Sequence, residues 1–505
     1  MVGFMAGKTS KVCCGLILGV VWLGGVVGGV GSGLEDFLGE PRFGRATWGV
    51  HMEEVETGRV LFSRNGERLL QPASSAKLMV GAMALDQWGA VRRWSTGLFQ
   101  EGEVNEDGEL SGRLIVRGVG DFSWSDQFGA GRAERVLEEM VAIIRGAGIR
   151  RIHGDLVGDT RLFKGPFWGV GWGWDDLQYG YGGGVSALMW GDGRFTMRME
   201  PGGEVGSGSR LLEFPSVAGL RVLNRVVTVG GGDPWGVLTD RAPGSGDLVL
   251  TGALALGSGV WEETFSVPDP AMAFLGELRR ALGVAGIVVE GDLDVWGWAT
   301  HGGRLPEEGG LRELGWVESA TAAQMVGVML GVSQNQYAQM LLMMAGAELE
   351  GLGEAGGLKW TADLGLERMG RFLARAGISA GEYRMDEGAG LARSDRVTPA
   401  ALVRLLRYME RHPERGAFVA GLPVTVIHTA ESELEVRAKS GTMSDIYALA
   451  GYAKPYGGRV LAFSVMLNGF RPGESAEGRR VVLESVRLAA KLAGERGEQG
   501  EDAGD

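Results

Sequence analysis

Three short motifs, far apart in the chain and in a fixed order, restrict the folds that this sequence can adopt. They are S-x-x-K at Ser74–Lys77, S-x-N at Ser333–Asn335 and K-[ST]-G at Lys439–Gly441. The sequence contains only eight lysines, and two of them complete motifs in this order, so chance is a poor explanation. A fold that uses the motifs together must bring three distant segments of the chain to one place.

The residue types in the motifs fit acyl transfer from an amide to a serine. A serine hydroxyl is a weak nucleophile at neutral pH and needs a base to take its proton. Residues three apart on a helix share a face, so Lys77 can reach the hydroxyl of Ser74. A lysine acts as a base only when its pKa is lowered. Burial beside a second cation lowers it, and Lys439 is the candidate for that cation.

The remaining motif residues are expected to move protons and bind substrate. Ser333 could carry a proton between the lysines and the leaving amine, and Asn335 offers an amide to the peptide group of the substrate. Gly441 lets its strand approach the substrate closely, with Ser440 and Thr442 beside it as substrate-binding residues. The backbone N–H groups of the nucleophile and of Thr442 are the expected oxyanion donors.

Other nucleophile and metal systems fit the sequence less well. No histidine stands beside a G-x-S-x-G elbow or in an H-E-x-x-H pair, so a Ser-His-Asp triad is only a weaker alternative. Both cysteines, Cys13 and Cys14, fall in an N-terminal apolar segment, which leaves the rest of the sequence without a thiol. We therefore expect no metal and no cofactor. The five histidines are His51, His153, His301, His412 and His428.

The N-terminus has the pattern of an export signal. Lys8 and Lys11 precede an apolar run from Val12 to Val30, and small residues suited to cleavage lie at residues 28–33. We expect cleavage there and a periplasmic location. The alternative is an uncleaved membrane anchor, because the apolar run is nearly long enough to cross a bilayer.

Length and composition favour a folded protein of several domains that does not bind nucleic acid. The chain has 505 residues, a net charge of -13 and no basic block. Its 89 glycines follow no collagen-like period and suggest turn-rich β structure. The expected parts are a signal peptide (1–33), a discontinuous catalytic domain (34–96 and 316–493), an inserted domain (97–163 and 286–315), a nested β-rich domain (164–285) and a disordered tail (494–505).

Hydrophobic periodicity assigns the motifs to secondary-structure elements. A helix is expected from Ala73 to Trp88, with Ser74 in its first turn. Helices from Ala322 to Leu330 and from Gln336 to Ala347 flank the second motif, and a strand from Leu434 to Ala438 leads into the third. The site should therefore lie where a helical part meets an antiparallel sheet.

Longer segments around the motifs match one family. Pro72 to Lys77 reads as P-A-S-x-x-K, Arg113 to Asp121 contains L-x-V-x-G-x-G-D, and Val436 to Thr442 reads as V-R-A-K-[ST]-G-T. Phe122 stands where the family pattern has a proline. These segments resemble the D-alanyl-D-alanine carboxypeptidase/endopeptidase family, the low-molecular-mass class C penicillin-binding proteins. Further matching segments are Gly154 to Asp159 and Val185 to Leu188.

The resemblance implies a mixed α/β (α+β) fold, in which a β-lactamase/transpeptidase-like domain with an antiparallel sheet flanked by helices is interrupted by two inserted β-rich domains. It implies a serine-type D-Ala-D-Ala carboxypeptidase or D,D-endopeptidase that hydrolyses peptidoglycan stem peptides or cross-links through an acyl-enzyme at Ser74. β-Lactam antibiotics are the implied covalent inhibitors. Peripheral association with the membrane is left open.

One segment departs from the family pattern. Glu387 to Arg393 resembles D-G-S-G-L-S-R but lacks both serines and has glutamate in place of aspartate. A catalytically impaired protein that binds the cell wall on the same fold is therefore one alternative. A β-lactamase-like hydrolase is another, because S-x-x-K and K-[ST]-G do not separate it from a peptidase.

Overall fold

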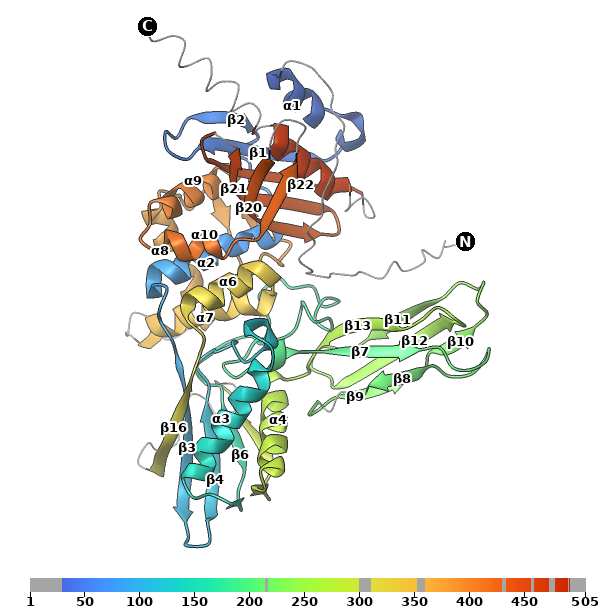
Figure 1. The fold of residues 1–505 in the computed structure, drawn as a ribbon, viewed down its shortest axis with the longest axis vertical. Helices are drawn as coiled ribbons and strands as arrows, with labels where there is room; N and C mark the ends of the chain where they lie inside the picture. The colour runs from blue at the N-terminus through green and yellow to red at the C-terminus, as the bar shows by residue number, and fades with distance from the viewer. Residues whose placement is uncertain are drawn as a thin grey trace. The chain divides into compact units, whose positions relative to one another are not determined.

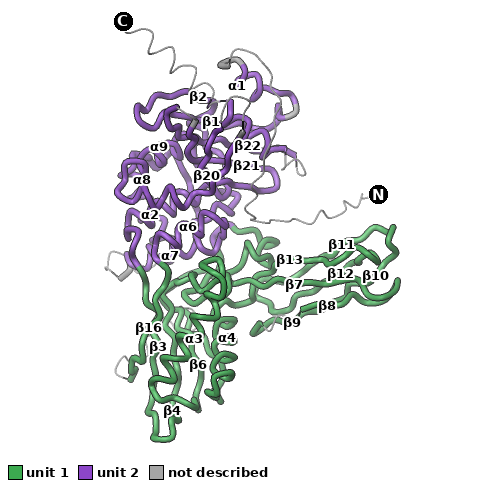
Figure 2. Tube along the Cα trace, viewed as in Figure 1, with its two compact units in different colours: residues 1–13, 93–168, 172–320 green, residues 14–92, 169–171, 321–505 purple. Residues whose placement is uncertain are grey.

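The computed structural model of the chain describes residues 30–213, 217–298, 310–351, 359–428, 433–455, 458–471, 477–488 and 490. The described chain divides into two compact units, coloured separately in Figure 2. The inserted unit comprises residues 93–168 and 172–320, and the motif unit comprises the described residues of 14–92, 169–171 and 321–505. All three motifs fall in the motif unit. The expected signal peptide and tail lie largely outside the described residues, and the predicted split of the insert into two domains stays a prediction.

The motif unit is built on a six-stranded antiparallel sheet with the strand order β19-β20-β21-β22-β1-β2. Figure 1 labels β1, β2, β20, β21 and β22 of this sheet. Strands from the two ends of the sequence are neighbours, because β1 pairs with β22 along its whole length. The strand expected to lead into the third motif is confirmed as part of β20. The strands are β1 Thr47–Glu54, β2 Val60–Arg64, β19 Val424–His428, β20 Glu433–Met443, β21 Ile446–Pro455 and β22 Leu461–Asn468.

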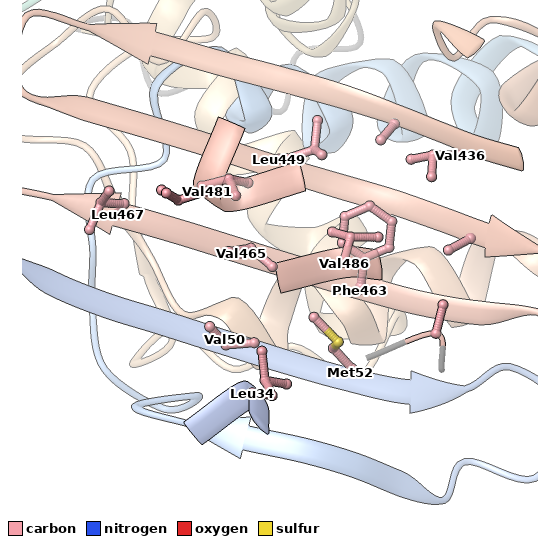
Figure 3. Packing of buried hydrophobic residues seen from close by; sticks show 14 of the residues in the cluster. Leu34, Val50, Met52, Val436, Leu449, Phe463, Val465, Leu467, Val481 and Val486 are labelled. Atoms are coloured by element: carbon pink, nitrogen blue, oxygen red, sulfur yellow. The ribbon is translucent and has the colours of Figure 1, made fainter. Parts of the chain in front are cut away.

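Helices cover both faces of this sheet. Seven consecutive residues of β22 are buried, as expected for a strand with protein on each side. On one face, Phe463 and Val465 pack in a core with Leu34 of α1 (Val30–Leu38) and Val486 of the helical segment 477–488 (Figure 3). On the other face, α9 (Pro399–Glu410) contacts β1, β21 and β22.

The central helix of the motif unit is α2 (Lys77–Trp88), which packs against α6, α7, α8, α9 and α10. Its residues from Lys77 to Leu85 are all buried, which is typical of a helix inside a core rather than on a surface. The two helices expected around the second motif are confirmed as α6 and α7. The other bounds are α6 Ala322–Val332, α7 Asn335–Gly351, α8 Thr361–Arg375, α10 Arg415–Ala420, β17 Tyr383–Arg384 and β18 Arg396–Val397.

The inserted unit contains a mixed sheet of seven strands with two helices packed on it. The order is β14-β5-β4-β3-β16, and β6 pairs with β4 and with β15. Helix α4 starts at Pro270 with Asp269 as its N-cap and contacts β6, β14, β15 and α3, although its sequence falls in the stretch expected to be β-rich. The bounds are β3 Ser95–Val104, β4 Glu109–Arg117, α3 Arg132–Gly146, β5 Arg151–Ile152, β6 Leu156–Asp159, α4 Pro270–Val284, β14 Val288–Val289, β15 Leu293–Trp296 and β16 Leu311–Glu318.

Two smaller sheets of the inserted unit account for its glycine- and tryptophan-rich stretch. One has the order β13-β7-β8, and the other has β10-β12-β11 with β9 paired to β12. They share a core that includes Met197, Leu250 and Phe265. The strands are β7 Arg194–Glu200, β8 Arg210–Glu213, β9 Arg221–Asn224, β10 Val227–Val229, β11 Gly236–Asp240, β12 Asp247–Ala255 and β13 Trp261–Ser266.

Candidate active site

Ser74 lies in a tight turn directly before the central helix. A 3-10 turn, η2 (Ala73–Ala76), precedes α2, so the α-helix begins later than the expected start at Ala73. Residues three apart eclipse one another in a 3-10 turn, and Lys77 Nζ lies 2.7 Å from Ser74 Oγ. Ser74 is partly exposed, whereas Ser75 is buried and its hydroxyl donates to the carbonyl of Pro72. Ser74 is therefore the accessible hydroxyl of the pair.

The turn is held by Gln71, which sequence reasoning did not single out. Ala73 has φ +47°, a left-handed conformation that is costly for a residue other than glycine. Its N–H donates to Oε1 of Gln71. Gln71 Nε2 donates in turn to the carbonyls of Ala392 at 2.8 Å and Gly390 at 3.3 Å. The only feature of the sequence that could have pointed to this contact is the position of Gln71, three residues before Ser74.

The amine of Lys77 is buried among hydrogen-bond acceptors. Besides Ser74, Nζ contacts Oδ1 of Asn335 at 2.6 Å and the main-chain carbonyl of Ala389 at 2.8 Å. An ammonium has three N–H donors, so these three acceptors match them. When the amine is neutral it keeps only two N–H groups. The contacts to Asn335 and Ala389 can hold those two and leave the lone pair directed at Ser74.

The third motif contacts the second. Lys439 is 1% exposed, and its Nζ donates to Ser333 Oγ at 2.8 Å and to the carbonyl of Ser440 at 2.7 Å. Ser333 is the C-cap of α6 with φ +61°, and Asn335 is the first residue of α7. Each lysine thus holds one residue of the S-x-N motif. The structure brings the three motifs together, and the roles of their residues stay predictions.

Gly441 allows strand β20 to pass close to Ser74. A Cβ at this position would lie 2.5 Å from the carbonyl oxygen of Pro72 and 2.8 Å from the backbone nitrogen of Ser74. Both are main-chain atoms that cannot rotate away, so only glycine fits here. On either side, Ser440 is half-buried and Thr442 is exposed. Their substrate and oxyanion roles are not tested by these contacts.

The segment that departs from the family pattern packs behind Lys77. The carboxylate of Glu387 is fully buried and accepts backbone N–H groups from Ala389, from Leu391 at 2.7 Å and from Ala392 at 3.3 Å. Glu387 thereby fixes the loop whose Ala389 carbonyl contacts Lys77. The lost serine at position 389 does not affect that contact, because the main chain makes it.

A Ser-His-acid arrangement occurs elsewhere in the motif unit. His51 contacts Ser63 Oγ through Nδ1 at 3.0 Å and Glu53 through Nε2 at 2.9 Å. Glu53 also pairs with Arg407 of α9 at 2.7 Å, so the group connects β1 and β2 to a helix and includes no motif residue. Within the described residues, no cluster of three or more His, Cys, Asp or Glu side chains is arranged to hold a metal ion.

Comparison with known proteins identifies the family of this chain. Residues 31–492 match the family described as D-Ala-D-Ala carboxypeptidase 3 (S13). The chain belongs to this family. The predicted family and the predicted class of serine-type D-Ala-D-Ala carboxypeptidase are thereby confirmed.

Two curated relatives and one solved structure illustrate how far the similarity extends. The D-alanyl-D-alanine carboxypeptidase of Actinomadura sp. (strain R39) is 29% identical over 457 residues, which cover 86% of this chain and 80% of the relative. The D-alanyl-D-alanine carboxypeptidase DacB of Haemophilus influenzae is 23% identical over 439 residues, covering 84% and 86%. The crystal structure of penicillin binding protein 4 (dacB) from Haemophilus influenzae matches this chain with a TM-score of 0.77 at 21% identity. The match covers 91% of this chain and 99% of that one. This similarity confirms the predicted fold class.

Proposed function

We propose that Ser74 is the nucleophile of this carboxypeptidase and that Lys77 is its general base. The observation that carries the proposal is the position of Lys77 Nζ, 2.7 Å from Ser74 Oγ and 2.6 Å from Asn335 Oδ1. These are hydrogen-bond distances for a proton transfer from the hydroxyl to the amine. Asn335 and the Ala389 carbonyl fix the amine so that it faces Ser74.

In the acylation step, neutral Lys77 takes the hydroxyl proton of Ser74 as Oγ bonds to the carbonyl carbon of the penultimate D-Ala. The negative charge moves to the carbonyl oxygen, where the backbone N–H groups of Ser74 and Thr442 stabilise it. The C–N bond then breaks. Ser333 gives its proton to the departing amine and regains one from the Lys77 ammonium, with Lys439 holding the Ser333 hydroxyl in place.

In the deacylation step, a water molecule takes the place of the departed amine. The water gives a proton to Lys77, its oxygen bonds to the acyl carbon, and Ser74 Oγ leaves and recovers its proton. The products are a shortened peptide with a free carboxylate and the original enzyme. The same steps cleave either a terminal D-Ala or a cross-link, because the two reactions differ only in the amine that leaves.

The proposed substrates are stem peptides and cross-links of peptidoglycan, and β-lactams are the proposed inhibitors. A β-lactam presents a strained amide to Ser74 and forms an acyl-enzyme by the same attack. One solved structure of the Haemophilus influenzae penicillin binding protein 4 is described as complexed with a novel β-lactam. That protein shares the fold of this chain at 19% identity, which supports the proposal without assigning the residues.

We further propose that the protein is exported and works in the periplasm after cleavage near residues 28–33. Leu34 and Leu38 of α1 are buried in the core of the motif unit, which supports a mature protein that keeps the chain from Leu34 onward. Helices of the described residues are all too short or too polar to cross a membrane.

Labelling with a fluorescent penicillin tests the proposal. We expect stable covalent labelling of the wild-type protein and none of Ser74→Ala. Ser75→Ala is the matched control. It should keep its label, because the Ser75 hydroxyl is buried against the carbonyl of Pro72. Labelling that survives in Ser74→Ala would refute the assignment, and Ser63→Ala would then test the serine beside His51.

The kinetics of the label separate the alternative functions. A label that is lost within seconds, together with released hydrolysed penicillin, would support a β-lactamase-like hydrolase. Absence of any label in folded wild-type protein would support a protein that only binds the cell wall. Release of D-Ala from a stem pentapeptide checks the peptidase activity directly.

A further inference from the structure

Two carboxyl groups with no assigned role are buried in the loop behind Lys77. Glu387 and Asp395 are both fully buried, and they lie at the two ends of residues 387–395. This loop supplies the Ala389 carbonyl to Lys77 and the carbonyls of Gly390 and Ala392 to Gln71. It therefore contacts both the proposed base and the residue that holds the turn containing Ser74.

The carboxyl oxygens of Glu387 accept backbone N–H groups from its own loop. Oε2 accepts the backbone N–H of Ala389, and Oε1 accepts those of Leu391 and Ala392. Three backbone donors are thus directed at one buried carboxyl group. Glu387 holds the loop through these contacts.

The contacts of Asp395 favour its protonated form. Oδ1 accepts the backbone N–H of Asp386 at 2.8 Å, but Oδ2 receives no hydrogen bond from any donor of the described residues. Burial, followed by the nearby charge of Glu387, raises the pKa of Asp395 far above its ordinary range. A protonated Oδ2 would donate a hydrogen bond to the carboxyl group of Glu387. Oδ2 would then have a partner, and the two carboxyl groups would not carry two negative charges side by side.

The charged groups near this pair come from several elements. Asp386 adds a negative charge and itself lies 3.6 Å from Arg384 of β17. Arg396 of β18 donates to the main-chain carbonyl of Asp395 at 2.7 Å. From α7, Gln339 accepts the Gly388 N–H and adds no charge. Lys77 reaches the loop through the Ala389 carbonyl.

We propose that Glu387 and Asp395 share one proton, and that this carboxyl–carboxylate pair positions the Ala389 carbonyl against Lys77. Both are positioning residues, and the inference rests on the proposed role of Lys77 as base. When the shared proton is lost at alkaline pH, two negative charges repel each other inside the loop. The Ala389 carbonyl then no longer holds the Lys77 amine toward Ser74, and acylation slows.

The pH dependence of acylation tests the pair. We expect the acylation rate of the wild-type protein with fluorescent penicillin to fall at alkaline pH. In Asp395→Asn the amide still donates to Glu387 but cannot ionise, so the ratio of the alkaline rate to the neutral rate should rise above that of the wild type. Asp386→Asn should move the fall to lower pH, because it removes a negative charge that keeps Asp395 protonated.

Two controls show whether a changed pH profile comes from the pair itself, from an unfolded variant or from a wrongly assigned nucleophile. Asp292→Asn, which removes an exposed carboxylate of the inserted unit, should leave the pH profile unchanged. Wild-type labelling at Ser74 at neutral pH verifies the nucleophile in the same experiment. An alkaline fall that stays at the wild-type pH in folded Asp395→Asn would overturn the pair.

Infrared spectroscopy of the wild-type protein gives an answer that does not depend on a folded variant. A protonated carboxyl group has a C=O stretch that a carboxylate lacks. We expect this band in the wild-type protein at a pH near 8, well above the ordinary range of an aspartate, and we expect Asp395→Asn to remove it. A wild-type spectrum without such a band at this pH would also overturn the pair.

Discussion

At the scale of single residues, the proposed chemistry depends on the amine of Lys77 and its three acceptors. Lys77→Ala removes the proposed base, and general-base help contributes about a hundred- to ten-thousand-fold. Acylation by fluorescent penicillin should slow by that range, as measured from the time course of labelling. Asn335 and Ala389 also lose a buried donor, so thermal unfolding must be followed in parallel.

Lys454→Ala is the control for this change, since Lys454 is an exposed lysine on β21. It should label at the wild-type rate. Acylation at the wild-type rate in a folded Lys77→Ala protein would remove Lys77 from the role of base. The hydroxyl of Ser74 would then need another partner, and none of the five histidines lies in a motif that supplies one.

The raised pKa of Asp395 also predicts how the stability of the protein changes with pH. Because this pKa is raised in the folded protein, over a pH window above the ordinary aspartate value the folded chain keeps a proton that the unfolded chain has released. The free energy of unfolding therefore falls as pH rises through this window. Asp395→Asn carries no titrating proton and should gain stability relative to the wild type as pH rises. Equal slopes of Tm against pH for the two proteins would contradict this.

At the scale of elements, the proposed site depends on how closely strand β20 passes η2, the turn that contains Ser74. Gly441→Ala places a Cβ against Pro72 and the backbone nitrogen of Ser74. The strand must shift, and a displacement of about 1 Å at a reaction centre can cost about a hundredfold in rate. We expect acylation by fluorescent penicillin to fall by about that factor.

Gly451→Ala is the matched control in the neighbouring strand β21. Its Cβ would lie 2.1 Å from the carbonyl oxygen of Arg437, so it also forces the sheet to adjust, but it does not touch Ser74. Both variants should lower Tm, and only Gly441→Ala should lower the acylation rate of the folded fraction. Equal loss of acylation in the two variants would mean that general distortion of the sheet is responsible.

The elements that carry the motifs could be predicted from the sequence because their signals are local. Apolar periodicity identified α6 and α7 on either side of Ser333, and an apolar run identified the strand before Lys439. Helix α4 also had a readable start, Asp269 followed by Pro270, but the glycine- and tryptophan-rich composition around it favoured strands.

The contacts that complete the site could not be predicted from the sequence. The Ala389 carbonyl is a main-chain group, which any residue at that position would supply. Gly390 also passes so close to the turn that a Cβ there would lie 2.0 Å from the Ala73 carbonyl oxygen, and this contact depends on the tertiary fold. The pairing of Glu387 with Asp395 depends on how the loop between them folds.

At the scale of the whole molecule, the inserted unit interrupts the motif unit in sequence but contains none of the motif residues. The segment that forms its two smaller sheets begins and ends at neighbouring positions, because Arg194 of β7 pairs with Ser266 of β13. Paired residues of antiparallel strands have Cα atoms about 5 Å apart. A short glycine linker can therefore join Arg194 to Ser266 in place of residues 195–265.

This deletion keeps α4 and the seven-stranded sheet, whose core includes Phe274, Leu275 and Leu278 of that helix. It removes most of the core around Met197 and Phe265, so Tyr179 and Val267 lose packing partners and Tm should fall.

The chemistry should persist, since the contacts among Ser74, Lys77 and Asn335 lie within the motif unit. We expect the folded deletion protein to be labelled by fluorescent penicillin at the wild-type rate, with Ser74→Ala in the same background as the unlabelled control. A folded deletion protein that cannot be acylated would show that residues 195–265 help to shape the site, and the separation of catalytic and inserted parts would then be wrong.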